Sequence, residues 1–349
     1  MRIALTGATG FLGVRLVREL LSRHEVLTVL ARTGSAGVVG RIEAALLAAG
    51  TPEPELRSRL RVVEVDLGAA RLGLSAASFR KLADDLDLVL HCAGSIDLEG
   101  ELAALRAVNV EGVRGVLELA AAGRRRPVPC HVSTAFVAGS RHSGVVHEDE
   151  LDGSWGFENA YERSKYEAEL LVRRWAARHR RPAVVLRPSI LVDHRPPDPG
   201  LPAHPLQVMA RLVTAFTPAD RTVTVPGDPA AHLNLLPVDD AARAISALAV
   251  AEPSGGVDTY HVVHERDVPI SELRHVLERV AGCRFTLDPR TPPGSAPTVP
   301  GFGPYLWHRR RYDDTRTRAV LTGPACAVPV DEDYLRIGVL PSRTPAVAR

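Results

Sequence analysis

A glycine-rich turn close to the N-terminus constrains the fold more than any other feature of this sequence. A short apolar run, residues 2–6 (RIALT), leads into three glycines in a GxxGxxG pattern over residues 7–13. Residues 11–22 then carry apolar side chains at helical spacing, and residues 25–31 (EVLTVLA) are typical of a second strand. Strand, glycine turn, helix and strand within about 30 residues predict the βαβ unit of a parallel sheet.

The glycine turn also has the composition of a dinucleotide-binding site. Glycines at this spacing allow a tight turn, a close approach of a pyrophosphate and close packing of helix on strand. The start of the helix supplies N–H groups and the positive end of its dipole. A purely structural glycine turn is the alternative, but the preceding strand and following helix are the context that the binding motif requires. The residues that we expect to contact a dinucleotide are Gly7, Thr9, Gly10, Phe11, Leu12 and Gly13.

The end of the second strand indicates which dinucleotide binds. NAD sites usually carry an acidic residue there for the ribose hydroxyl, whereas an arginine suits the 2′-phosphate of NADP. Here the strand ends in Arg32 with no acidic neighbour, which favours NADP(H). Arg41 is either a second phosphate ligand or a solvated helix position. Asp66 and Leu67, which end the third strand, either meet the adenine ring or form a strand-end turn.

Strand-like and helix-like segments continue to alternate up to residue 192. Further strands are expected at 61–66, 86–91, 128–137 and 183–192, and helices at 101–122 and 159–180. This alternation predicts an α/β fold with a Rossmann-type, doubly wound parallel sheet. Beyond it, the sequence indicates a helix at about 206–216, a strand and helix within 233–250, a strand at 260–263 and a helix at 270–282.

A proline-rich segment, DHRPPDPGLPAHP, interrupts the alternation after Val192. We therefore divide the chain into two domains. Residues 1–192 plus 233–255 are expected to bind NADP, and residues 193–232 plus 256–349 to form a smaller substrate-binding cap. Because long irregular loops in compact domains are often lids, we expect residues 194–205 to border the substrate entrance.

Tyr161 and Lys165 form a YxxxK pair on the predicted helix 159–180, where positions i and i+4 share one face. A nearby ammonium favours the phenolate and lowers a tyrosine pKa from its usual value of about 10. Such a pair can exchange a proton with a substrate oxygen, although YxxxK also occurs by chance. Ser133 and Thr134 end a predicted strand, beyond which ligands bind in open α/β sheets. We expect Thr134 to hold a carbonyl oxygen beside the tyrosine, and Ser133 to cap the strand.

Several motifs together resemble the extended short-chain dehydrogenase/reductases. They are TGATGFLG, HCAG (91–94), VNVEG (108–112), VSTAFVAG (132–139), YERSK (161–165) and RPSI (187–190). A second set is similar to the branch of thioester reductases and fatty acyl-CoA reductases, the male-sterility type. It comprises Arg32 with Arg41, VDL (65–67), LGLS (72–75), FENAYERSKYEAE (157–169) and residues 304–321.

The resemblance implies a catalytic triad of Thr134, Tyr161 and Lys165. It also implies contacts with the nicotinamide half of the cofactor from Ala93, Gly94, Asn109, Pro188 and Ser189. The implied activity is an NADPH-dependent transfer of hydride to a carbonyl. The leading expectation is an acyl thioester bound to a carrier protein or to CoA, which would give an aldehyde or alcohol.

Two departures from the family pattern leave the substrate open. Asp193 follows Val192 where relatives usually have a glycine, and VAG (137–139) replaces the VYG of sugar-modifying relatives. Reduction or oxidation of a free ketone, aldehyde or alcohol is therefore an alternative. A nucleotide-sugar dehydratase is less favoured, because Ala135 follows Thr134 where dehydratases carry an acidic residue, and an epimerase is less favoured, because epimerases hold NAD and Arg32 argues against NAD. A non-catalytic NADP-binding regulator would tend to lack the Tyr–Lys pair.

Composition excludes several other classes of protein. The formal net charge of +2 argues against a nucleic-acid or anionic-membrane partner. The basic clusters at 124–126, 173–181 and 309–311 are interpreted as solvated surface, with docking of an acidic carrier protein or a CoA phosphate as the alternative.

The four cysteines lack a CxxC pair, which favours a cytoplasmic setting. The thirteen histidines lack HxxxH and HExxH spacing, so no metal site is expected. No apolar run approaches the ~20 residues of a membrane span, and nothing indicates the oligomeric state.

Overall fold

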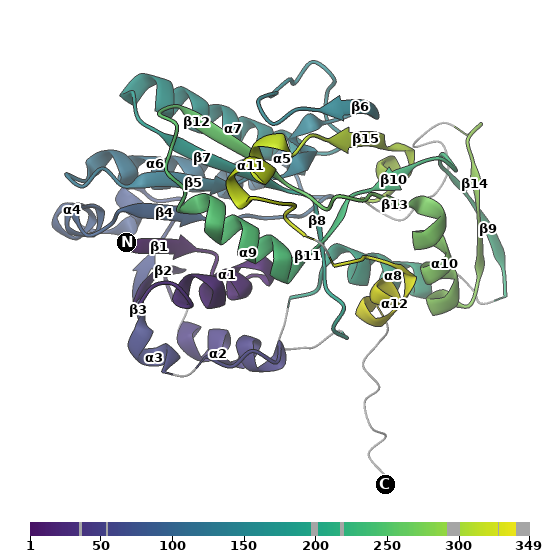
Figure 1. Cartoon of the computed structure of the whole chain (residues 1–349), viewed down its shortest axis with the longest axis horizontal. Coiled ribbons are helices and arrows are strands. Elements are labelled where there is room, and N and C mark those ends of the chain that lie inside the picture. The colour runs from purple at the N-terminus through teal and green to yellow at the C-terminus, as the bar shows by residue number, and fades with distance from the viewer. Residues whose placement is uncertain are drawn as a thin grey trace, which may run out of the picture.

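A parallel sheet of seven strands lies at the centre of the larger part of the molecule, which we call the sheet half (Figure 1). From one edge to the other its strands are β12 (Val257–Val262), β7 (Ala183–Pro188), β5 (Val128–Val132), β4 (Leu88–His91), β1 (Ile3–Thr6), β2 (Leu27–Arg32) and β3 (Leu60–Val65). The strand order reverses between β1 and β4, and ligands bind at such a switch point. The predicted doubly wound α/β fold is confirmed.

The computed structural model describes residues 1–34, 37–53, 55–196, 202–216, 220–291, 301–326 and 328–339. Within these ranges, no helix is both long enough and apolar enough to cross a lipid bilayer. Residues 197–201, the middle of the proline-rich segment expected to border the substrate entrance, lie outside the described residues.

Helices cover both faces of the sheet (Figure 1). One face carries α1 (Phe11–Leu21), α2 (Val38–Ala48) and α9 (Val238–Ala249), and the other carries α4 (Ala76–Asp84), α5 (Leu102–Asn109), α6 (Glu111–Ala122) and α7 (Ala160–His179). Two short helical segments, α3 (Leu56–Arg59) and η1 (Ala70–Gly73), flank β3. The single helix expected over 101–122 is two helices that meet at Val110. Its backbone stays near the helical region (φ −94°, ψ −49°), so the apolar periodicity runs on across the break.

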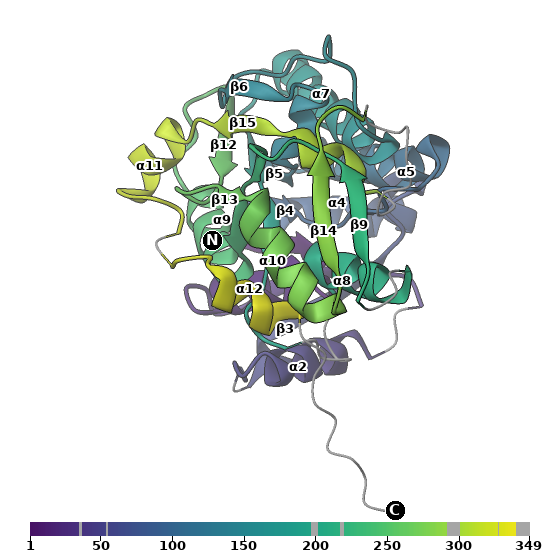
Figure 2. The same cartoon turned by 90° about the vertical axis from the view of Figure 1, so that its right-hand side faces the viewer.

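The cap stands at one end of the sheet and has a separate hydrophobic core (Figure 2). It contains α8 (Pro205–Phe216), α10 (Ile270–Ala281), α12 (Glu332–Val339) and the parallel pair β9 (Thr222–Pro226) with β14 (Arg284–Asp288). Three further strand pairs are β6 (Ser143–Val146) with β15 (Arg309–Tyr312), β8 (Ile190–Val192) with β11 (Leu235–Pro237), and β10 (His232–Leu233) with β13 (Val268–Pro269). The short helices η2 (Ala135–Ala138), η3 (Gly303–Trp307) and α11 (Thr315–Leu321) complete the described chain.

Three sequence-based boundaries need correction. The division at residue 256 assigns β12 to the cap, but β12 pairs with β7 along its whole length and is the edge strand of the main sheet. Parallel pairing joins distant segments, so an apolar run predicts a strand without showing its partner. The strand expected over 128–137 ends at Val132, where the chain turns into η2. The strand expected over 183–192 is two strands, β7 and β8, in different sheets.

Candidate active site

The glycine turn packs the start of α1 against the loop that follows β4. Gly7 has a φ of 74°, and a Cβ on it would lie 2.7 Å from the backbone nitrogen of Ala93. A Cβ on Gly13 would lie 1.9 Å from the carbonyl oxygen of Gly7. Both positions therefore require glycine. Gly10 is the N-cap of α1 and no side chain caps this helix, so its first N–H groups suit an anion such as a pyrophosphate.

Thr6, which the sequence analysis did not single out, fixes the loop that faces this turn. Its Oγ1 accepts hydrogen bonds from the backbone N–H groups of Cys92 (3.1 Å) and Ala93 (3.0 Å). Its hydroxyl therefore donates to Nδ1 of His91, at 2.8 Å. The loop between β4 and α5 is held in place from the carboxyl end of β1. A hydroxyl residue directly before the first glycine is the sequence signal for this role.

Asn109 holds the same loop from the other side. Its Oδ1 accepts the N–H of Ser95 at 2.8 Å, and its Nδ2 donates to the carbonyl of Ser95 (3.0 Å) and to Oγ of Ser164 (2.9 Å). The missing Cβ of Gly94 faces Oδ1 of Asn109 at 3.0 Å. Asn109 is 1% exposed, so in this structure it connects the loop to α7. Contact of Asn109 and Gly94 with a nicotinamide stays a prediction.

Thr134, Tyr161 and Lys165 come together at the carboxyl end of β5. The Thr134 hydroxyl accepts the N–H of Phe136 at 3.3 Å, which begins η2, and it lies close enough to the phenol of Tyr161 to influence the pKa of that phenol. Nζ of Lys165 is buried and donates to the carbonyl oxygen of Val132, the last residue of β5, at 2.7 Å. The structure therefore places the three predicted catalytic side chains in one site.

Burial determines the protonation of this site. It raises the pKa of Tyr161 to about 12, although the nearby Thr134 hydroxyl acts in the opposite direction. It lowers the pKa of Lys165 to about 8. The expectation that Lys165 lowers the pKa of Tyr161 is therefore wrong here, because desolvation is the largest effect and the ammonium bonds to Val132 instead. At neutral pH Tyr161 is a protonated phenol, which is the form that donates a proton to a carbonyl oxygen.

Ser133, the neighbour of Thr134, belongs to a buried ion pair beside this site. Its hydroxyl donates to Oε2 of Glu169 at 3.2 Å. Glu169 accepts two bonds from Arg187, at 2.6 Å from Nη2 and 3.0 Å from Nε, and both side chains are 0% exposed. Arg187 also donates to the carbonyl of Glu150 at 2.6 Å. This pair joins α7, β5 and β7 to the loop after β6, which gives the arginine of the RPSI motif a structural role.

The residues predicted to meet the adenosine half lie at the carboxyl ends of β2 and β3. Arg32 is the exposed last residue of β2, and Arg41 is exposed on the first turn of α2. Asp66 accepts the N–H of Gly68 at 3.0 Å through Oδ1, so its side chain forms a strand-end turn. Leu67 is half-buried against the core beneath α4 and α6.

The remaining residues predicted to contact the cofactor lie in the glycine turn and at the end of β7. Thr9 is half-buried in the glycine turn and Leu12 is buried on α1. Phe11 packs under the Arg15 guanidinium, 4.8 Å from its ring centroid. Pro188 ends β7, and Ser189 follows with a buried hydroxyl that has no hydrogen-bond partner among the described residues. Such a hydroxyl is available to a ligand.

Tyr305, a cap residue whose role the sequence did not predict, contacts the catalytic helix. Tyr305, from η3, donates to Oε1 of Glu162 at 2.9 Å and accepts from Nδ2 of Asn159 at 2.8 Å. Its ring meets that of Phe136 edge to face, with centroids 5.0 Å apart. Burial raises the pKa of Glu162 to about 7. Tyr305 thus touches both the turn after Thr134 and the start of the helix that carries Tyr161. No local pattern reveals a contact over this sequence distance.

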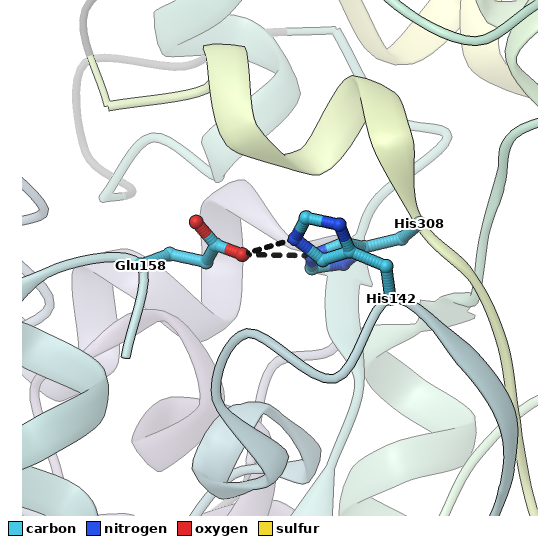
Figure 3. A group of neighbouring side chains, drawn as sticks. All are labelled: His142, Glu158 and His308. Carbon is cyan, nitrogen blue, oxygen red and sulfur yellow. Dashed lines mark hydrogen bonds and ion pairs between the residues drawn. The ribbon is translucent and has the colours of Figure 1, made fainter. Parts of the chain in front are cut away.

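A second cluster lies beside Tyr305. His142, Glu158 and His308 point toward one another from three separate segments (Figure 3). Nε2 of His142 lies 2.7 Å from Oε1 of Glu158, and Nε2 of His308 lies 3.6 Å from the same oxygen. Motif spacing could not reveal this group, because each side chain belongs to a different segment.

Comparison with protein families gives one match that covers most of the chain. The NAD-binding family model described as "Male sterility protein" matches residues 5–245. This range contains the glycine turn and all three catalytic candidates. It also extends through the proline-rich segment to α9, so it includes part of the cap.

Two curated relatives and one solved structure are similar to the chain. It is 31% identical over 307 residues to a nonribosomal peptide synthetase of Aspergillus aculeatus, covering 82% of this chain and 18% of the relative. It is 26% identical over 294 residues to the L-2-aminoadipate reductase large subunit of Penicillium chrysogenum, covering 79% of this chain and 20% of that relative. The terminal R domain from the myxalamid PKS-NRPS biosynthetic pathway superposes with a TM-score of 0.77 at 26% identity, covering 97% of this chain and 89% of that one. The chain thus spans about a fifth of the length of these curated relatives.

Proposed function

Because this chain belongs to the male sterility protein family and is an NAD(P)-dependent oxidoreductase of the extended short-chain dehydrogenase/reductase type, we propose that it reduces an acyl thioester with NADPH. The observation that carries this proposal is that the buried phenol of Tyr161, whose pKa is raised to about 12, lies beside the Thr134 hydroxyl at the carboxyl end of β5. A protonated phenol beside a second hydroxyl suits reduction, because a carbonyl oxygen gains negative charge as hydride arrives at its carbon.

The residues of the site divide this work between them. Thr134 and Tyr161 would donate hydrogen bonds to the substrate oxygen, and Tyr161 would pass its proton to it. Lys165 lies one helical turn beyond Tyr161, so its ammonium would hold the ribose next to the nicotinamide. Bound NADPH supplies the hydride. With a thioester, the resulting hemithioacetal breaks its carbon–sulfur bond to give an aldehyde, and the sulfur leaves as a thiol.

The glycine turn fits the pyrophosphate of such a cofactor. The backbone around Gly7 and Gly13 leaves no room for side chains, and no side chain caps the first N–H groups of α1. We assign the 2′-phosphate to Arg32, with Arg41 as a second ligand, because both guanidinium groups are exposed beside the expected ribose. Charge-assisted contacts of this kind distinguish NADPH from NADH.

The thioester part of the proposal is supported by the relatives. A peptide synthetase and an aminoadipate reductase are among them, and the R domain has nearly the same length as this chain. We propose that the acyl group is presented on a carrier protein or on CoA. A free aldehyde is the product of the first hydride transfer and meets the same two hydroxyls, so a second reduction to the alcohol is chemically open.

All four cysteines are unpaired, and the expected cytoplasmic location stays a prediction.

A substrate panel tests this proposal. The purified protein is mixed with NADPH and, in parallel, with acyl-CoA thioesters, carrier-bound acyl thioesters, free aldehydes and nucleotide sugars. We expect NADPH oxidation with thioesters, accompanied by free thiol. Activity restricted to free ketones or aldehydes, or conversion of nucleotide sugars without net NADPH oxidation, would replace the thioester assignment with one of the alternatives.

A further inference from the structure

The cluster of His142, Glu158 and His308 is not used by the proposed reaction. His142 lies between η2 and β6, Glu158 directly precedes α7, and His308 lies between η3 and β15 (Figure 3). One ligand atom from each of the three residues lies within 4.8 Å of the other two. Two imidazoles and one carboxylate, brought together from separate segments, form a set of side chains that commonly binds metal ions.

We propose that His142, Glu158 and His308 bind one divalent transition-metal ion, and that zinc suits the set best. Imidazole nitrogens favour zinc and its neighbours over magnesium and calcium, which prefer sites made of oxygen ligands. Two histidines and one glutamate leave a fourth position for water in a tetrahedral site. The sequence-based expectation of no metal site rested on local spacing and did not consider ligands this far apart.

The distances within the cluster are close to those of a zinc site. A tetrahedral ion about 2.0–2.2 Å from each ligand keeps its ligand atoms roughly 3.3–3.6 Å apart. Here Nε2 of His308 is 3.6 Å from Oε1 of Glu158, and Nε2 of His142 is 2.7 Å from it. The ligand atoms of His142 and His308 lie within 4.8 Å of each other. Shifts of roughly an ångström would bring all three separations into the range of a tetrahedral site, and His142 is the most exposed of the three, at 41% of its side chain.

The burial of His308 is an independent sign of a missing ligand. The residue is 2% exposed, and its Nε2 has no hydrogen-bond partner among the described residues. Figure 3 shows its ring directed at Glu158. A buried polar nitrogen without a partner is costly, so such an atom calls for a ligand that the described residues do not supply. A metal ion shared with Glu158 and His142 would satisfy it.

The ion would fasten the cap to the catalytic helix. Glu158 donates its backbone N–H to Oε2 of Glu162 at 3.0 Å, and Glu162 follows Tyr161. His308 comes three residues after Tyr305, which bonds to Glu162 from the cap. A metal ion at His308 and Glu158 would therefore hold η3 and the start of α7 together next to Tyr161. Its role in this proposal is structural, since none of its ligands belongs to the catalytic triad.

Metal content and a cobalt spectrum test the proposal without measuring turnover. The full chain is stripped with a chelator, and Zn²⁺ or Co²⁺ is then titrated into it. We expect one equivalent to bind, a rise in the thermal midpoint with Zn²⁺, and the visible absorption of four-coordinate Co²⁺. His308→Ala and Glu158→Gln should each weaken binding at least tenfold, since each removes one of three protein ligands.

His147→Ala is the matched control, because His147 follows the opposite end of β6 from His142, is exposed and pairs with Asp313 at 3.4 Å outside the cluster. It should bind the metal like the unmodified chain, and NADPH titration shows that every variant is folded. The proposal is overturned if the stripped protein binds neither ion, or if binding is the same in His308→Ala. It is also overturned if His147→Ala weakens binding as much as the ligand variants do. Each of these results leaves the proposed reductase activity untouched.

Discussion

The glycine turn and the border between the cap and α7 differ in how far apart in the sequence their contacting residues lie. In the sheet half, β1, the glycine turn, α1 and β2 follow one another within the first 32 residues and pack together. At the border between the cap and α7, β6 pairs with β15 and Tyr305 contacts Glu162, so partners are separated by well over a hundred residues. Local patterns therefore describe the cofactor side of the site well and the substrate side poorly. If function is divided in the same way, substitutions near the glycine turn and substitutions in the cap should affect different properties of the protein.

The largest expected effect is on turnover, from a residue of the sheet half. Tyr161→Phe removes the proton donor and should lower kcat about 10²- to 10⁴-fold. The Kd for NADPH should stay nearly unchanged, because the ring remains. Steady-state kinetics with a thioester, together with a binding titration, check both numbers. Full activity in this variant would show that Tyr161 is not the acid.

The next effect is on stability, at the glycine turn. Gly13→Ala would place a Cβ 1.9 Å from the Gly7 carbonyl oxygen, and backbone atoms cannot move aside cheaply. The free energy of unfolding should fall by about 3 kcal/mol or more. Gly40→Ala is the control: it lies inside α2 with open space around its missing Cβ, so it should be neutral or stabilising by up to about 1 kcal/mol. Denaturant unfolding of both variants measures the difference, and equal stabilities would contradict the described turn.

Cofactor choice should depend on Arg32. Loss of a charge-assisted phosphate contact predicts that Arg32→Ala weakens NADPH binding about 10- to 150-fold. NADH, which lacks the 2′-phosphate, should bind almost as before. Arg41→Ala should show a smaller change in the same direction. Titration of both cofactors decides the matter, and equal affinity of the unmodified chain for the two would remove the NADPH assignment.

A substitution in the cap should affect the substrate rather than the cofactor. Tyr305→Phe keeps the ring against Phe136 but removes the donor to Glu162 and the acceptor for Asn159. Loss of these buried hydrogen bonds should lower the free energy of unfolding by about 1–2 kcal/mol. We expect a changed KM for the thioester and an unchanged Kd for NADPH. If NADPH affinity fell instead, the two halves would not be functionally separate in the way proposed.

Lys165 should make the free energy of unfolding depend on pH. Its pKa is about 8 in the folded chain and near 10.5 when unfolded, so between these values the unfolded chain binds more protons. The free energy of unfolding should therefore rise with pH across this window, by at most about 1.4 kcal/mol per unit. Lys165→Met removes this titrating group. Plots of the free energy of unfolding against pH for the unmodified chain and for Lys165→Met should therefore differ in slope above pH 8. Parallel curves would mean that Lys165 is not desolvated.

The sequence alone was sufficient for the features that local physics determines. The buried parallel strands are continuous apolar runs, and the glycine spacing and YxxxK pair predicted the turn, α7 and the placement of Thr134 beside Tyr161. The boundary at β12 was wrong because an edge strand shows its partner only in three dimensions.

The protonation of the site and the cap contacts could not be predicted in this way. The pKa of Tyr161 depends on how completely the phenol is desolvated, and the position of Lys165 depends on the carbonyl of Val132, which no side-chain pattern specifies. Likewise, Tyr305 and His308 reach the start of α7 only because η3 and β15 return across the cap. Irregular segments rich in proline and arginine lack apolar periodicity, so the sequence does not predict which distant residues they contact.

The most direct test of the central claim is the stoichiometry of a single reaction. A carrier-bound or CoA-bound acyl thioester is incubated with the protein and NADPH, and oxidised cofactor, free thiol and aldehyde or alcohol are all quantified. The account predicts one thiol for each acyl group converted, one or two NADPH oxidised per thiol according to whether the product is aldehyde or alcohol, and no thiol release without NADPH. Thiol release that proceeds without NADPH, or NADPH oxidation that releases no thiol, would contradict it.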